Sequence, residues 1–386
     1  MKKSKVSILA ILLMASLMVS ISVLCASDDV DASYSLTVED GLGRTHSFDR
    51  IPSKIVTIGT GLTATAIDLD LLDRMVVCDR YSVLDNHDLF DGLRDYVNDD
   101  RIRANGTAYA TGLDAIINDI VYMTEKLSLV ESVGNSGDYE TRNVAVFITG
   151  IPASLETLYN ELTTSEFHYR HVLCWDTIDS YEQLIDMVRT MSLVMTGDVD
   201  EHVLQMEQIV EYIELQLSGN PGMERRKAFY VTYSGGELKV GNEGSLANSM
   251  IIAAGGTSIT MDPMKPKTYS TNISMLLEEY GTDVVIFVDN TLASNDVNMD
   301  VLKKSLGGQD VKLVRLDPLW NNYCIESMNG VWAMACAMYS DVYPDVFSGD
   351  VPVMSNDYED DILTFAIAGI IGAVMIAILS YLYFRT

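Results

Sequence analysis

The longest amphipathic pattern in the chain lies between residues 181 and 217. Its second half places apolar side chains at the spacing of one helix face, namely at Val203, Met206, Val210, Ile213 and Leu217. About twenty residues at 1.5 Å each predict a rod of about 30 Å, long enough to lie along two lobes. The alternative interpretation is an ordinary core helix inside one domain.

The ends of this pattern carry helix signals. Ser180 followed by Gln183 is typical of a capping box, and Gly197 suits the residue after a helix. Asp198 and Asp200 then place acids where the dipole of a second helix favours them. We therefore predict that residues 181–218 form a linking backbone-helix region.

Strand and helix patterns alternate on both sides of this region, which predicts βαβ units and parallel sheets. The predicted elements of the first half are a hairpin over 35–48, strands at 54–59, 75–79 and 171–175, and helices at 63–72 and 155–162. Those of the second half are strands at 227–232, 283–288 and 311–316 and helices at 246–254, 275–280 and 329–340. The fold class is therefore α/β, with Rossmann-like lobes at 34–180 and 223–345.

Residues 85–140 leave two strand registers open. Residues 85–103 are strongly polar, and a helix fits 107–118. In the preferred register the next strand is 120–123, which leaves an insertion after it. In the other register the strand is 144–149.

The N-terminus has the pattern of a signal peptide over residues 1–27. Three lysines precede an apolar run over 6–24, and small residues follow at 25–27. An uncleaved anchor is the alternative. A lipidation site at Cys25 is a poor match, because Leu24 is too large for the preceding position.

The C-terminus predicts a membrane anchor. Residues 362–384 hold no charged side chain and are long enough to span a bilayer, with Arg385 behind them. Residues 346–361 read as an acidic tether. We expect a single-pass protein of the cell membrane, with an extracytoplasmic body and a cytoplasmic C-terminus.

Composition narrows the class of partner. The formal net charge is −29, from 55 acids and 26 bases, which argues against nucleic-acid binding. Of five cysteines, Cys78, Cys174, Cys324 and Cys336 lie beyond the predicted signal peptide and form no CxxC pair. Buried free thiols are therefore favoured over a disulfide framework.

Three motifs of the first half are similar to those of one protein family. They are Asp40-Gly41-Leu42-Gly43-Arg44, Pro52-Ser53-Lys54-Ile55-Val56 and Leu71-Leu72-Asp73-Arg74-Met75-Val76-Val77. Their order resembles the substrate-binding proteins of ABC importers for iron-siderophore, haem and cobalamin. Lys54 stands where Arg is common, and Asp73 where Gly is common. The resemblance covers about residues 36 to 345.

This resemblance implies a function and partners. Two lobes on a stiff helical backbone would capture an iron chelate, haem or a corrinoid between them. They would deliver it to an ABC permease with its ATPase, without covalent chemistry and without a cofactor of their own. The alternatives are a bare zinc or manganese binder, or a tethered surface receptor or enzyme not coupled to transport.

Candidate ligand-binding residues follow from the strand ends, because ligands bind beyond the carboxyl ends of strands in open α/β sheets. They are Thr60, Gly61, Tyr81, Ser82, Tyr233, Ser234, Asp289, Asn290, Trp320, Asn321 and Asn322. The family adds an aromatic residue, for which Tyr269 is the candidate. It also implies one acid on each lobe for permease docking, and we expect these at Asp114 and Glu278.

Motifs for other chemistry are missing. The histidines are His46, His87, His168, His171 and His202, and only His168 and His171 are close in sequence. Core or surface histidines are therefore favoured over metal ligands. No GxSxG, HExxH or Walker A pattern occurs, so a catalytic site is not expected.

Overall fold

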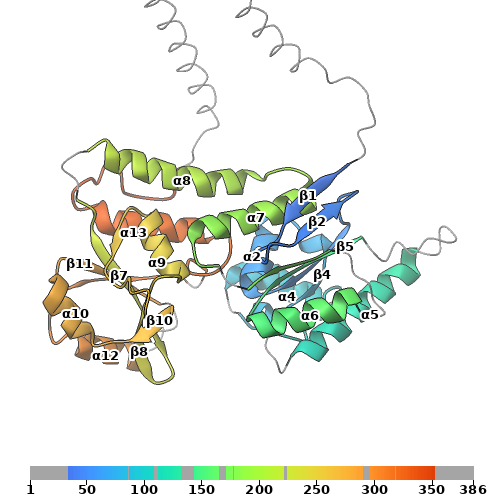
Figure 1. Ribbon diagram of the computed structural model, residues 1–386, viewed down its shortest axis with the longest axis horizontal. Coiled ribbons are helices and arrows are strands. Elements are labelled where there is room, and N and C mark those ends of the chain that lie inside the picture. The colour runs from blue at the N-terminus through green and yellow to red at the C-terminus, as the bar shows by residue number, and fades with distance from the viewer. Residues whose placement is uncertain are drawn as a thin grey trace, which may run out of the picture.

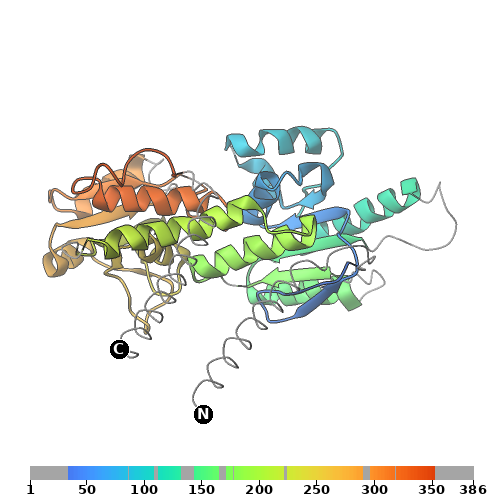
Figure 2. The same ribbon diagram turned by 90° about the horizontal axis from the view of Figure 1, so that it is seen from above.

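The computed structural model describes residues 34–85, 87–107, 112–131, 143–164, 171–176, 178–220, 224–289, 296–317 and 319–352. Two α/β lobes lie side by side, and two helices lie across them (Figures 1 and 2). This arrangement confirms the predicted α/β class with parallel sheets. The predicted signal peptide, residues 1–27, lies outside the described residues.

The first lobe is built on a four-stranded parallel sheet in the order β4-β3-β5-β6. Its strands are β3 (Lys54–Ile58), β4 (Met75–Cys78), β5 (Val144–Thr149) and β6 (His171–Trp175). Its helices are α2 (Thr60–Asp68), η1 (Leu72–Arg74), α3 (Arg80–Leu84), η2 (Asp88–Phe90), α4 (Asp91–Asn98), α5 (Leu113–Glu131) and α6 (Pro152–Thr164).

Both faces of this sheet are buried, which explains why its strands are apolar at nearly every position. One face packs against α5 and α6, where Ile116 and Leu158 join Val56 and Ile148 in one cluster. The other face packs under α2 and the linking helices. The first lobe is therefore a three-layer sandwich.

The predicted hairpin forms from β1 (Leu36–Glu39) and β2 (Thr45–Phe48), and it contacts the edge strand β6. Buried Asp40 holds it there. Its carboxylate accepts the backbone N–H of Leu42 and Arg44 within the turn, at 3.0 and 2.9 Å, and the N–H of Cys174 in β6 at 3.1 Å. Burial alone would raise the pKa of Asp40, but these bonds and His46 lower it below its usual value.

The second lobe contains a six-stranded mixed sheet in the order β10-β8-β7-β11-β12, with β9 paired to the start of β7. Its strands are β7 (Lys227–Ser234), β8 (Glu237–Gly241), β9 (Thr257–Ser258), β10 (Thr268–Ser270), β11 (Val284–Val288) and β12 (Lys312–Arg315). Its helices are α9 (Leu246–Ala253), α10 (Ile273–Tyr280), α12 (Asp296–Ser305) and α13 (Ser327–Tyr339). The parallel strands β7, β11 and β12 all point toward the same edge.

The linking region consists of two helices, α7 (Tyr181–Thr196) and α8 (Glu201–Ser218). The predicted caps are present: Ser180 Oγ accepts the N–H of Gln183 at 3.1 Å, and Gly197 adopts a left-handed φ of 86°. Asp200 then accepts the N–H of His202 and starts α8. The reversal lays α8 beside α7, so the backbone is a helix pair rather than one rod (Figure 1).

The pair and several loops join the lobes. The N-terminus of α7 contacts α9 through the N–H of Tyr181, which donates to Ser249 Oγ at 2.8 Å. The side chain of Lys267 pairs with Asp179. On the far side of the first lobe, His87 Nε2 lies 3.6 Å from Asp317 Oδ1 of the second lobe.

The preferred register of residues 85–140 is wrong. Residues 120–123 lie inside α5, and the strand is β5 (Val144–Thr149), as the other register predicted. The apolar residues Ile120 and Met123 are buried by packing under the sheet, not by pairing within it. A short apolar run fits either role, because burial and not periodicity decides between them.

Two expectations for the C-terminus are also corrected. Part of the predicted tether packs on the second lobe: Phe347 is fully buried, and Trp332 Nε1 donates to the carbonyl of Gly349 at 3.1 Å. The predicted single-pass membrane location is wrong: within the described ranges no helix is long and apolar enough to cross a bilayer. Residues 362–384 lie outside the described residues.

The four cysteines after residue 33 are free, as predicted. Cys78, Cys174 and Cys324 are buried and Cys336 is half-buried. Burial raises the pKa of each of these thiols. The increase is smallest for Cys336, whose pKa rises to about 11. They therefore act as small apolar side chains of the core.

Replacing Asp40 should test its role in docking the hairpin. We expect Asp40→Asn to lower the free energy of unfolding by about 1–3 kcal/mol at neutral pH, because an amide leaves buried N–H groups without acceptors. The lowered pKa means that this stabilisation is present above the unfolded pKa of about 3.9 and is lost as the pH falls through the folded pKa.

Urea unfolding at neutral and acidic pH measures both effects. The gap between the natural protein and Asp40→Asn should narrow in acid. Exposed Asp49, the residue after β2, is the matched control, and Asp49→Asn should change stability by less than about 0.5 kcal/mol. Equal effects of the two substitutions would contradict the assigned role.

Candidate functional site

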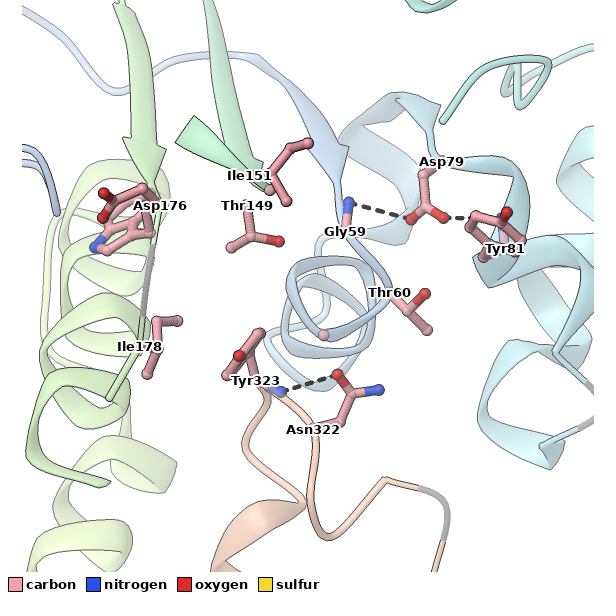
Figure 3. Close-up of a pocket in the computed structure, with 13 residues that line it drawn as sticks. Gly59, Thr60, Asp79, Tyr81, Thr149, Ile151, Asp176, Ile178, Asn322 and Tyr323 are labelled. Carbon is pink, nitrogen blue, oxygen red and sulfur yellow. Dashed lines mark hydrogen bonds between the residues drawn. The ribbon is translucent and has the colours of Figure 1, made fainter. Parts of the chain in front are cut away.

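A cavity of about 340 Å³ lies where the carboxyl ends of the first lobe's strands face a loop of the second lobe (Figure 3). Each strand of the first sheet supplies residues just past its end, and the loop after β12 supplies two more. The lining residues are Gly59, Thr60, Gly61, Asp79, Tyr81, Thr149, Gly150, Ile151, Trp175, Asp176, Ile178, Asn322 and Tyr323. The site is therefore at the edge where such sheets bind ligands.

Gly59 makes the turn from β3 into α2. Its φ is 132°, and a Cβ there would lie 2.1 Å from the Thr149 hydroxyl oxygen. Only glycine meets both the backbone and the packing requirement. The turn thereby brings the first turn of α2, with Thr60 and Gly61, to the cavity wall.

Asp79, just past β4, organises the next wall. Its side chain is 2% exposed and accepts four hydrogen bonds, from the N–H groups of Gly59, Tyr81 and Ser82 and from the Ser82 hydroxyl, at 2.7–3.2 Å. Burial raises the pKa of Asp79 despite these donors. The carboxylate caps α3 and fixes Tyr81, whose ring is 51% exposed at the rim.

Asp176, just past β6, lies on the opposite wall (Figure 3), and Trp175 at the end of β6 also lines the cavity. The Trp175 indole packs against Gly41 of the hairpin, where a Cβ would lie 2.2 Å from its ring. It also stacks on Phe147, with ring centroids 6.1 Å apart. The hairpin that Asp40 docks on β6 therefore positions an aromatic wall of the cavity.

The second lobe closes the cavity with Asn322 and Tyr323. The N–H of Tyr323 donates to Asn322 Oδ1 at 2.9 Å, and the carbonyl of Asn322 accepts the Ser327 hydroxyl at the start of α13. The backbone of Tyr323 lies so close to α2 that a Cβ on Gly61 would come within 2.4 Å of its carbonyl oxygen. Gly61 thus lets the two lobes touch.

Of the residues predicted from strand ends, Thr60, Gly61, Tyr81 and Asn322 line the cavity. Ser82 is fully buried below it and bonds to Asp79. Asn290 lies outside the described residues. The first lobe thus brings together more of the expected residues than the second.

The other predicted residues of the second lobe do not line the cavity. Tyr233 and Tyr269 pack on the sheet face under α10 and α12, and Ser234 is exposed at the end of β7. Asp289 accepts a hydrogen bond from Tyr230. Trp320 packs on the core and Asn321 is half-buried beside it.

Sequence reasoning missed the residues at the ends of β5 and β6. Thr149, Gly150 and Ile151 were missed because the preferred register put the strand elsewhere. Trp175 and Asp176 follow a strand that was predicted, so the strand-end rule applied to every strand would have included them.

Neither a metal nor a basic cluster marks the site. Among the parts of the chain that the structure describes, no group of three His, Cys, Asp or Glu side chains is placed to hold a metal ion. His171 stacks on Phe48 at 4.0 Å, and His168 lies outside those parts. The described lining contains aromatic rings, hydroxyls, an amide and carboxylates, which suit a polar or planar ligand.

Comparison with known proteins finds likeness only in structure. No protein-family model matches the sequence. A search of curated protein sequences also gives no match.

Solved structures do match over most of the chain. CeuE from Helicobacter pylori in a nickel–histidine complex has a TM-score of 0.55 at 14% identity, over 81% of this chain and 91% of that one. A periplasmic heme-binding protein from Pseudomonas aeruginosa has a TM-score of 0.51 at 15% identity, over 79% and 100%. The periplasmic vitamin B12-binding protein BtuF of Vibrio cholerae has a TM-score of 0.50 at 15% identity, over 75% and 98%.

These matches show that the chain has the fold of periplasmic binding proteins. The resemblance predicted from the sequence motifs is confirmed at this level. The similarity spans both lobes and the linking helices, because it covers about four fifths of the chain.

The contact between Gly61 and Tyr323 can be tested with two glycine substitutions. Gly61→Ala should destabilise the protein by about 1–3 kcal/mol, because its Cβ has no room against the Tyr323 backbone. Gly92 in α4 meets only the end of the Leu72 side chain, so Gly92→Ala should be neutral or stabilise by up to about 1 kcal/mol. Urea unfolding of both variants decides the point, and a neutral Gly61→Ala would show that the lobes do not touch there.

Proposed function

We propose that this protein is the extracytoplasmic substrate-binding component of an ABC importer. It captures an iron chelate, haem or a corrinoid in the cavity between its lobes and delivers it to a membrane permease with its ATPase. Residues 1–27 direct its export. The protein binds its ligand without chemical conversion.

The observation that carries this proposal is the position of the cavity. It lies at the carboxyl edge of the first sheet and is closed by a loop of the second lobe. Capture between two lobes needs residues from both, and Tyr81 and Tyr323 supply exposed rings from either side. Structures with this fold include proteins described as binding heme, vitamin B12 and a nickel–histidine complex.

Ligand contacts are assigned to the side chains that line the cavity. Exposed aromatic rings supply apolar contact with planar or chelate ligands. Thr60, Thr149 and Asn322 supply hydrogen bonds that fix the orientation. This composition favours a complex with an organic shell over a bare ion, which needs several converging N, O or S ligands.

A surface receptor or enzyme uncoupled from transport is the second candidate. Two exposed acids favour transport over it. Asp114 lies in the first turn of α5 and Glu278 near the end of α10, one on each lobe. Acids in such positions would meet basic residues of a permease and guide its docking.

A ligand panel tests the binding function. Ferric siderophores, haemin and cyanocobalamin are titrated into the purified protein by calorimetry and thermal shift, beside zinc and manganese ions. We expect one chelate class to bind with one-to-one stoichiometry and to raise the melting temperature. Failure of every chelate, or saturable binding of a bare ion alone, would overturn the proposal.

The docking acids are tested separately. Asp114→Lys combined with Glu278→Lys should reduce recovery of the permease from detergent-solubilised host membranes at least about tenfold, because two charge pairs become repulsive. Ligand affinity should not change. Glu211→Lys, an exposed acid on α8, is the control and should recover the permease normally. Normal recovery with the double variant would reject these two residues as docking contacts.

A further inference from the structure

The charge of the cavity restricts which ligands it can take. Two carboxylates, Asp79 and Asp176, line it, and none of the described lining residues is Lys, Arg or His. Arg80 is exposed outside the lining, and Lys267 is paired with Asp179.

The two carboxylates differ in what neutralises them. Asp79 accepts four hydrogen bonds, three from Tyr81 and Ser82 and one from the N–H of Gly59, so its oxygens already have partners within the protein. Asp176 is half-buried and makes no hydrogen bond or ion pair with any residue for which the structure gives a position. Because Asp176 lines the cavity and no described residue neutralises it, its carboxylate is available to a positively charged ligand.

Aromatic rings reinforce the same preference. Trp175 and Asp176 line the cavity at the end of β6. Tyr81 lines it from the start of α3, and Tyr323 from the loop after β12 (Figure 3). Such a ring favours a cation that meets its face, because its quadrupole is negative there. The net charge of −29 raises the local concentration of cations further.

The size of the cavity limits the ligand in a second way. A volume of about 340 Å³ is at the lower end of the range of about 300–1,000 Å³ for ligand sites. It encloses a compact chelate more readily than a whole macrocycle with its side chains.

From these observations we infer that the cavity selects a compact, positively charged metal complex and rejects anionic chelates, with Asp176 as the residue that sets the charge preference. This inference rests on the proposed function and narrows its ligand class. It places ferric siderophores with a net negative charge, and haem with its two propionates, outside the preferred ligands.

Two inert cobalt(III) complexes of similar size but opposite charge test the inference. Bis(ethylenediamine)oxalatocobalt(III) carries one positive charge, and ethylenediaminebis(oxalato)cobaltate(III) carries one negative charge. Calorimetry with the purified protein should show at least about tenfold tighter binding of the cation, the size of effect expected from one unscreened carboxylate. Added salt should weaken binding of the cation.

Variants at one position identify the group responsible. Asp176→Asn keeps the shape, and should weaken cation binding about five- to tenfold while changing anion binding less. Asp176→Glu should restore most of the preference. Glu211→Gln removes one exposed carboxylate on α8 and should leave the ratio unchanged. Melting temperatures check that all three variants fold.

Three outcomes would overturn the inference: equal or tighter binding of the anion, a ratio unaffected by Asp176→Asn, or binding of neither complex. The proposed function fails separately. If haemin or an anionic ferric siderophore binds tightly in the ligand panel, the binding function stands and the charge preference falls. If only the cobalt cation binds, the charge preference stands and the assigned ligand classes fall.

Discussion

One hydrophobic core passes through both lobes and limits how they can move. Buried residues of the first sheet, the linking helices and the second sheet belong to a single connected cluster, which includes Phe147, Met191 and Tyr230. Separating the lobes would expose this surface at a cost of about 25 cal/mol per Å² of apolar area. We therefore expect the lobes to move little and the cavity to open mainly through its rim loops.

Two buried carboxylates hold the walls of the cavity in position. Asp40 docks the hairpin on β6, and the glycine beside it packs on Trp175. Asp79 draws the end of β4 and the start of α3 together and so sets the position of Tyr81. Each acts because a carboxylate can accept several backbone N–H groups at once. The walls of the cavity are therefore held by residues that the ligand need not touch.

Short sequence patterns were sufficient to predict the turns and helix ends that depend only on neighbouring residues. The Asp40 turn, the Ser180 cap and the helix end at Gly197 depend on neighbouring residues only, and each was predicted from the sequence. Three of the four strands in the first lobe were also predicted in place, so the strand-end rule correctly named Thr60 and Tyr81 as residues that line the cavity. The family resemblance agreed with the observed fold. Each motif is short, but the resemblance rested on the order of several motifs along the chain.

The sequence by itself determined the alternation of strands and helices, the helix ends and the class of fold, because these depend on local hydrogen bonds and apolar periodicity. Tertiary structure alone decided that residues 120–123 pack as helix, since a short apolar run is buried equally well in either form. It also decided which strand ends face the cavity. Tyr233 follows the same strand-end rule as Tyr81, but it packs on the face of its sheet under α10 and α12 and does not line the cavity. Only the tertiary structure distinguishes the two.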